Sequence, residues 1–207
     1  MTAAVCDVLD PATAATMADL LAHWWSRPIA GEIDSWSGWH ELGRNVAEAT
    51  GTATPMEHLL SPIPAEERRA LIDEHERLFV GPGTVPCPPY ESVWRNDVPV
   101  HLRRSLMGPC TEDLRRLYTE IGLQVAPSSG ELPDHVAVEL EALAYAIRSP
   151  GSIQSAGALL TDHLAKWLPA FCRAVAHETA QPFYKELAVL TPGWLAELAR
   201  QLPGSDR

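Results

Sequence analysis

The sequence predicts an all-α fold, a helical bundle with a larger N-terminal lobe and a smaller C-terminal lobe joined by a hinge. Apolar residues recur three and four positions apart in successive segments of the 207-residue chain, a spacing that places them on one face of a helix. Proline and glycine separate these segments and mark where helices begin and end. One long stretch, residues 78–94, breaks the pattern and predicts an ordered loop.

Three helices are expected before this loop. Asp10 is a favourable N-cap and Pro11 suits a first helical position, so the first helix is expected to begin there and to end near Ser26. The second and third are expected from Trp36 to near Gly51, and from Ser61 or Pro64 into the loop.

The loop contains four prolines and two glycines. Proline removes an N–H donor and fixes φ, while glycine favours positive φ, so neither a helix nor a regular strand is expected. Leu78, Phe79, Tyr90 and Trp94 at its ends are residues that proteins normally bury. Two interpretations remain open: a rigid connection whose aromatic side chains fill the core, or a pre-organised wall of a peptide-binding groove.

The chain is expected to divide after a further helix that runs from Thr111 to Gly122. Residues 125–132 combine proline, serine and glycine, which favours a flexible linker. They are predicted to be the hinge between the two lobes, residues 1–124 with the loop and residues 133–207. Such hinges also permit exchange of a lobe between protomers, so a monomer or a domain-swapped dimer is expected.

The C-terminal lobe is expected to be helical throughout. Its first helix should open at Pro133 and Asp134, with Asp134, His135 and Glu139 off its apolar face. Two longer helical segments follow, with a kink predicted at Pro169 and a kink or a restart predicted at Pro192-Gly193.

Charge and composition exclude several classes of partner. The net charge is −11, which argues against a nucleic acid and against an anionic membrane surface. No apolar run reaches the ~18 residues of a membrane span, and the first residues lack the pattern of a secretory signal. A cytoplasmic protein without stable membrane insertion is therefore expected. The four cysteines are scattered and predict free thiols rather than a zinc site.

The familiar enzyme and cofactor motifs do not occur, so no catalytic residue, metal or cofactor is expected. Asp134, His135 and Glu139 form the strongest polar group, because a spacing of four residues brings side chains together on a helix. They are compatible with a metal site, with acid–base chemistry, with binding of a cationic group, or with a solvated helix face. His75 and His163 lie among apolar residues and are interpreted as hydrogen-bonded core histidines.

Several motifs resemble those of the TorD/DmsD-like redox-enzyme maturation chaperones, which are related to nitrate-reductase chaperones. The resemblance covers roughly residues 65–200 in the same order. It rests on the segments Leu78-Phe79-x-Gly-Pro-Gly, Pro88-Pro89-Tyr90-Glu91-Ser92-Val93-Trp94, Leu106-Met107-Gly108-Pro109, Leu132-Pro133-Asp134-His135-Val136-x-Val138-Glu139-Leu140, His163-Leu164-x-x-Trp167-Leu168-Pro169-x-Phe171 and Phe183-Tyr184-x-x-Leu187-Ala188.

The resemblance implies a non-enzymatic, all-helical chaperone of the TorD-like type. Such proteins bind the twin-arginine signal peptide on the catalytic subunit of a molybdopterin-dependent oxidoreductase and assist cofactor insertion and assembly before export. It also implies a peptide site between the loop and the Asp-His motif. The implied site residues are Phe79, Pro88, Pro89, Tyr90, Ser92 and Trp94 on one side, and Asp134, His135 and Glu139 on the other.

The residues fit this expectation, because two guanidinium groups need carboxylates beside an apolar groove. Asp134, Glu139 and Glu91 would supply the carboxylates. Two other interpretations remain open. One is a helical adaptor that recognises the folded catalytic subunit independently of its leader, and the other is an enzyme or nucleotide-binding protein that uses Asp134, His135 and Glu139.

Overall fold

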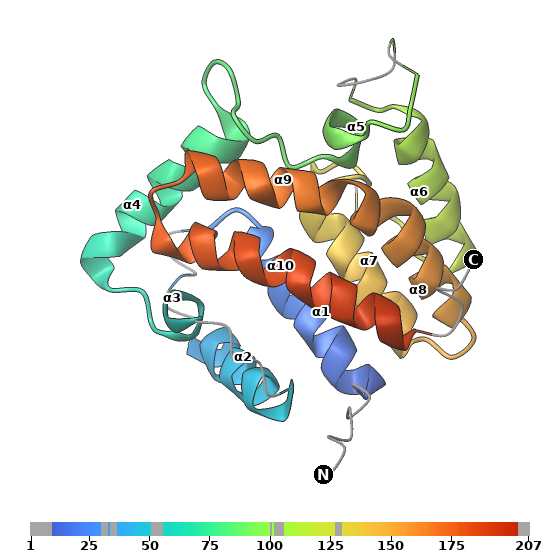
Figure 1. Cartoon of the computed structure of the whole chain (residues 1–207), viewed down its shortest axis with the longest axis horizontal. Helices are drawn as coiled ribbons and strands as arrows, with labels where there is room; N and C mark the ends of the chain where they lie inside the picture. Colours follow the sequence, from blue (N-terminus) through green and yellow to red (C-terminus); the bar gives the residue numbers. More distant parts are fainter. Residues whose placement is uncertain are drawn as a thin grey trace, which may run out of the picture.

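The computed structural model describes residues 10–29, 33, 37–50, 56–99, 101, 106–126 and 130–202. Within these ranges the chain forms helices and no named strand, and its only extended pairing is an isolated antiparallel bridge between Tyr90 and His135. The predicted all-α fold is confirmed (Figure 1). No helix in the described ranges combines the length and apolar character needed to cross a membrane.

The N-terminal part begins with α1, whose N-cap is Asp10 as predicted. The Asp10 carboxylate accepts hydrogen bonds from the backbone N–H groups of Ala12 and Thr13, which satisfies donors that lack helical partners. The elements of this part are α1 (Pro11–Trp25), α2 (Ser37–Thr50), α3 (Glu57–Leu60), α4 (Ala65–His75), the π-helical turn η2 (Glu76–Val80), α5 (Glu91–Trp94) and α6 (Pro109–Glu120).

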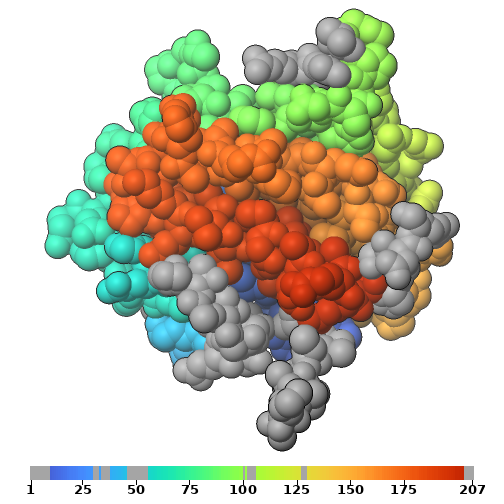
Figure 2. Space-filling view, viewed as in Figure 1, coloured from blue at the N-terminus to red at the C-terminus, as the bar shows by residue number. Residues whose placement is uncertain are grey.

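The C-terminal part contains the longest of the described helices, α10, which lies beside α9 across one face of the molecule (Figure 2). Its elements are α7 (Val136–Arg148), α8 (Ile153–Ala158), the π-helical turn η5 (Leu159–Leu164), α9 (Ala165–Glu178) and α10 (Pro182–Gln201). Pro169 lies inside α9 and Pro192 inside α10, so neither proline ends its helix, and the kinks expected at them stay predictions.

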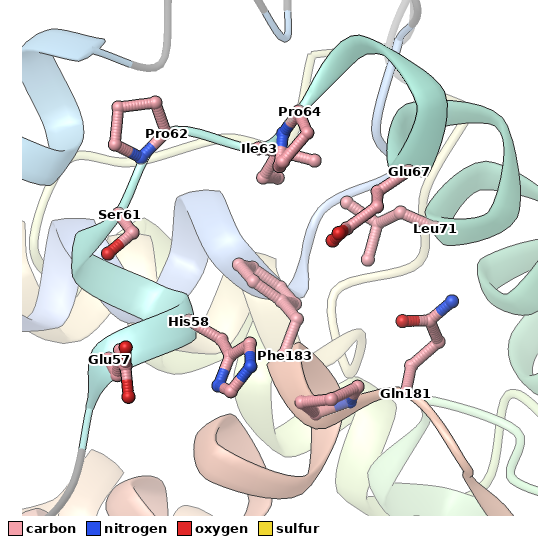
Figure 3. Close-up of a pocket in the computed structure, with 11 residues that line it drawn as sticks. Glu57, His58, Ser61, Pro62, Ile63, Pro64, Glu67, Leu71, Gln181 and Phe183 are labelled. Carbon is pink, nitrogen blue, oxygen red and sulfur yellow. The ribbon is translucent and has the colours of Figure 1, made fainter.

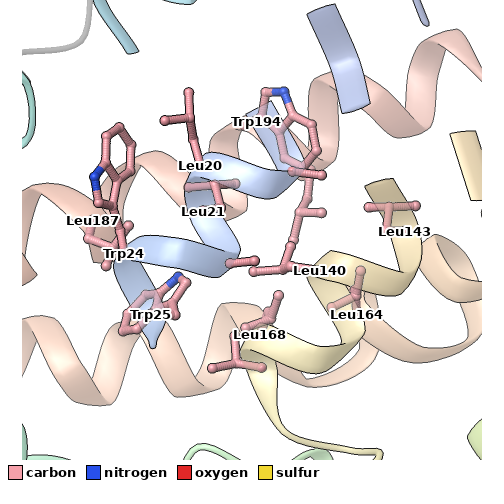
Figure 4. Close-up of a cluster of buried hydrophobic side chains, with 14 of the residues drawn as sticks. Leu20, Leu21, Trp24, Trp25, Leu140, Leu143, Leu164, Leu168, Leu187 and Trp194 are labelled. Atoms are coloured by element: carbon pink, nitrogen blue, oxygen red, sulfur yellow. The ribbon is translucent and has the colours of Figure 1, made fainter. Parts of the chain in front are cut away.

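The core is shared between residues on either side of the predicted hinge. Helix α1 packs along α7 and also contacts α10, and both Trp24 and Trp25 are almost completely buried. Figure 4 shows leucine and tryptophan side chains from α1, α7, α9 and α10 meeting in one cluster. The Trp25 indole N–H donates to Thr191 Oγ1 at 3.0 Å, which satisfies a polar group that burial would otherwise leave unpaired. The division into two lobes remains a prediction, and three residues of the proposed hinge, 127–129, lie outside the described ranges.

The loop prediction is correct in its centre and wrong at its ends. Leu78 and Phe79 belong to η2, and residues 91–94 form the short helix α5. All four prolines fall between these two elements, so the steric argument applies only to the segment that they occupy. Gly81 has a φ of 110°, and its N–H bonds to the carbonyl of Glu76 at 2.8 Å, which closes the π-helical turn. Within this segment Cys87 N–H donates to Leu78 C=O at 3.0 Å and holds the loop back on η2.

Two helix starts differ from expectation. Helix α6 begins at Pro109 with Gly108 as N-cap, two residues before the predicted cap Thr111, because proline is well suited to a first helical position. Helix α7 begins at Val136 with His135 as N-cap, rather than at Pro133 and Asp134. The residues before α7 are instead paired with the loop.

Candidate functional site

The two segments singled out by the sequence are joined by backbone hydrogen bonds. Glu91 N–H donates to Asp134 C=O, and Val136 N–H donates to Pro89 C=O, both at 2.9 Å. Ser92 N–H also donates to the Asp134 carboxylate at 3.2 Å, so this side chain caps the first turn of α5 from across the fold. We call this contact between residues 88–94 and residues 134–139 the motif junction.

At the edge of the motif junction, the Tyr90 ring meets the His135 ring edge to face, with centroids 5.3 Å apart. The Tyr90 hydroxyl donates to the exposed Glu131 carboxylate at 3.3 Å, and burial followed by the Glu131 charge raises the pKa of Tyr90 to about 12. Burial lowers the pKa of His135. Its Nδ1 accepts from Ala137 N–H at 3.2 Å, which requires this nitrogen to be unprotonated.

Behind this edge, the carboxylate of Glu91 is fully buried and has two side-chain partners. It pairs with Arg95, and His163 Nδ1 lies 2.9 Å from its Oε2. Arg95 also donates to the carbonyl of Asp162 at 2.9 Å and pairs with Asp97 at 2.5 Å. These contacts fix α5 against η5. They also confirm that His163 is a hydrogen-bonded core histidine.

Asp134 and Glu139 are also completely buried, with exposures of 0%. Of the interpretations left open for these residues, the solvated helix face is therefore wrong for Asp134 and Glu139. One side of α7 packs on α1, and η5 also packs against α7, so its polar side is covered as well. Burial raises the pKa of Glu139 well above its usual value, and the charges of Glu91 and Asp134 act in the same direction. Trp167 donates its indole N–H to Glu139 at 3.4 Å.

The aromatic residues of the predicted site separate into core and surface. Phe79 is buried between the rings of Trp25, His75 and Tyr184 and fills the core, while Pro89 and Ser92 are also buried. Pro88, Tyr90 and Trp94 remain partly accessible. Trp94 donates its indole N–H to Pro88 C=O at 2.7 Å, and the Tyr90 hydroxyl contacts Glu131. We call Pro88, Tyr90 and Trp94 the rim of the motif junction.

The comparisons with known proteins agree with these motifs. The family model described as nitrate reductase delta subunit matches residues 45–173. A protein named Tat proofreading chaperone DmsD from Salmonella typhi is 32% identical over 147 residues, which cover 69% of each chain. A chaperone protein TorD from Shewanella piezotolerans is 32% identical over 109 residues, covering 52% of this chain and 50% of that protein. The chain belongs to the TorD/DmsD-like family of redox enzyme maturation chaperones.

Membership of this chaperone family means that the protein is not an enzyme. The fold agrees with a crystal structure of a redox enzyme maturation protein from Archaeoglobus fulgidus, with a TM-score of 0.60, 24% identity, and coverage of 88% of this chain and 93% of that one. In the described part of the chain, no three His, Cys, Asp or Glu side chains converge as a metal site requires. Asp134, His135 and Glu139 are therefore residues of a chaperone, in which they lie in the motif junction.

Sequence reasoning missed the residues that hold the motif junction together from outside the two motifs. Arg95 lies four residues after Glu91, a helical spacing that signals a pair. No local signal connects His163 or Trp167 with the carboxylates they contact, because each lies far away in sequence. Whether the junction residues contact a peptide remains a prediction.

Proposed function

We propose that this chaperone binds the N-terminal twin-arginine leader of the catalytic subunit of a molybdopterin-dependent oxidoreductase. In this proposal it holds the client before export and assists cofactor insertion and assembly. The observation that carries the proposal is the similarity to a Tat proofreading chaperone over 69% of both chains. Tat is the twin-arginine export pathway, and its client proteins carry twin-arginine leaders.

The surface of the motif junction supports this proposal. Pro88, Tyr90 and Trp94 offer partly accessible apolar area, and the exposed carboxylate of Glu131 lies beside it within reach of the Tyr90 hydroxyl. A leader with two arginines and an apolar segment requires this combination, since guanidinium groups bind carboxylates through paired hydrogen bonds. The net charge of −11 would also accelerate encounter with a basic peptide.

The buried carboxylates take an indirect part in this proposal. Asp134 accepts from Ser92 N–H, and Glu91 holds Arg95 and His163, so both determine where the accessible rim lies. A direct contact between a leader and Asp134 or Glu139 would require the motif junction to open, because neither side chain reaches solvent. In this proposal the accessible residues of the rim bind the leader, and the buried carboxylates hold the rim in position.

Isothermal titration of the full chain with a synthetic twin-arginine leader tests the proposal. We expect binding, and we expect replacement of both leader arginines by alanine to weaken it at least about tenfold, because two charge-assisted contacts are lost. Equal affinity for the two peptides would contradict the proposal. A complex with the client that survives deletion of the leader would instead favour the adaptor that recognises the folded subunit.

Variants of two tyrosines locate the binding surface. Tyr90→Ala should weaken leader binding, whereas Tyr145→Ala should leave it unchanged, because Tyr145 is exposed on α7 and lies outside the motif junction. Thermal unfolding of both variants serves as the control. If Tyr90→Ala loses its folded structure, the loop serves the core rather than a peptide.

A further inference from the structure

A hollow lies between the α3–α4 connection and the start of α10, and none of the residues that line it belongs to the motif junction (Figure 3). Its volume is about 200 Å³, below the roughly 300 to 1,000 Å³ typical of sites for whole small-molecule ligands. Most of the residues around it are exposed, so it opens to solvent. Its size suits one side chain of a partner better than a cofactor. We call it the α3–α10 pocket.

The base of the α3–α10 pocket is apolar. Leu71 and Phe183 are buried at its base, and Ile63 lies above them, half-buried, between two prolines. Such a surface stabilises the apolar stem of an amphipathic side chain while its charged end stays at the mouth.

The mouth of the pocket carries negative charge, and no partner for it lies in the part of the chain that the structure describes. Glu57 and Glu67 both line the pocket and are exposed, and neither carboxylate has a hydrogen bond or an ion pair with another described residue. By contrast, the neighbouring Glu186 is paired with His58 at 2.7 Å. In Figure 3 the Glu67 carboxylate points into the space in front of Phe183, with the Gln181 amide beside it. Two unpaired carboxylates disfavour an anionic ligand and favour a cation.

We propose that the α3–α10 pocket binds an arginine side chain of the client leader. The Glu67 carboxylate and the Gln181 side-chain oxygen would accept from the guanidinium, and Leu71 and Phe183 would contact its methylene groups. Arginine suits this arrangement because its planar fork of donors serves two acceptors at once and also packs on an aromatic ring. The inference rests on the proposed leader binding and adds a contact site that is separate from the motif junction.

Two glutamate variants of α4 test this inference by titration with the leader peptide. Glu67→Gln keeps the size of the side chain and removes its charge, and we expect it to weaken binding about threefold to tenfold. Glu66→Gln makes the same change at the adjacent exposed residue, which does not line the pocket, and we expect its affinity to stay within about twofold of the unmodified protein. Both variants should fold, since both side chains are exposed.

Peptides with citrulline in place of each arginine identify the contact. Citrulline keeps the shape of arginine without its charge, so the effect of Glu67→Gln should disappear with one of the two citrulline peptides. If Glu67→Gln and Glu66→Gln bind the arginine leader as tightly as the unmodified chain, the inference is overturned while leader binding stands.

A smaller probe separates failure of the inference from failure of the proposed function. In a nitrogen-15 NMR titration of the full chain, N-acetyl-arginine N-methylamide should shift the amide signals of Glu67, Leu71 and Gln181. The citrulline analogue and the Glu67→Gln variant should show no such shifts. These shifts would support the pocket even if the leader itself failed to bind, and shifts confined to other parts of the protein would overturn the inference.

Discussion

The buried carboxyl of Glu139 makes the stability of this protein sensitive to pH. Burial is the main cause that raises the pKa of Glu139 in the folded state. The pKa of a glutamate in an unfolded chain is about 4.3. The stabilising contribution of the protonated group is fully present below the unfolded pKa and is lost as pH rises through the folded pKa. Glutamine in its place would keep an acceptor for the Trp167 indole N–H and would never ionise.

We therefore predict that Glu139→Gln becomes progressively more stable than the unmodified protein as pH rises above about 4.3. The difference in the free energy of unfolding should grow by at most about 1.4 kcal/mol per pH unit. Urea unfolding at a series of pH values measures it. Glu120→Gln, at an exposed position of α6, reports the effect of removing a surface charge, and parallel curves for all three proteins would contradict the prediction.

At the scale of elements, α5 depends on Arg95 for its attachment to the C-terminal helices. The helix has only four residues, too few to be stable alone. The guanidinium of Arg95 links the buried Glu91 of α5 to the carbonyl of Asp162 in η5. Loss of this cation would leave the Glu91 carboxylate buried with the His163 ring as its remaining side-chain partner among the described residues.

We predict that Arg95→Ala lowers the free energy of unfolding by about 3 to 5 kcal/mol, the usual effect of removing one partner of a buried ion pair. Arg115→Ala is the matched control, because Arg115 makes an exposed pair with Glu112 in α6, and it should cost about 1 kcal/mol or less. Denaturant unfolding measures both values. Equal effects of the two substitutions would show that α5 is anchored by its backbone contacts alone.

The whole molecule is held by a core that crosses the predicted hinge. Helix α1 lies among helices of the C-terminal part, packed on α7 and bonded through Trp25 to Thr191 of α10. Each large apolar side chain in that contact contributes about 1.5 to 3 kcal/mol through burial. Separating residues 1–124 from 133–207 would expose this area on both pieces.

We predict that the full chain unfolds in a single cooperative transition, and that residues 133–207 expressed alone do not form a folded domain. Calorimetry of the full chain and the dispersion of amide signals from the fragment check these outcomes. Two resolved transitions, or a folded fragment, would show that the lobes are independent. Light scattering over a range of concentrations separately tests for a monomer or a swapped dimer.

The helices were predictable because their apolar spacing is local information. The motif residues also meet in the structure, through the pairing of Tyr90 with His135, while the peptide site that the resemblance implies there stays a prediction. The burial of Asp134 and Glu139 was not predictable, because helical spacing shows which residues share a face but not whether another element covers that face. The α3–α10 pocket was not predictable for a related reason, since Glu67 and Phe183 line it from segments that are far apart in sequence.

The bridge between Tyr90 and His135 also bears on how much variation the intervening chain can tolerate. The bridge closes a long loop that contains α6. The entropic cost of closing a flexible loop, expressed as a free energy, rises by only about 0.6 kcal/mol when the loop doubles in length. Insertions between α5 and α6 would therefore weaken the pairing very little. Proteins that share this bridge can differ in the length of that connection while the two motifs stay in register.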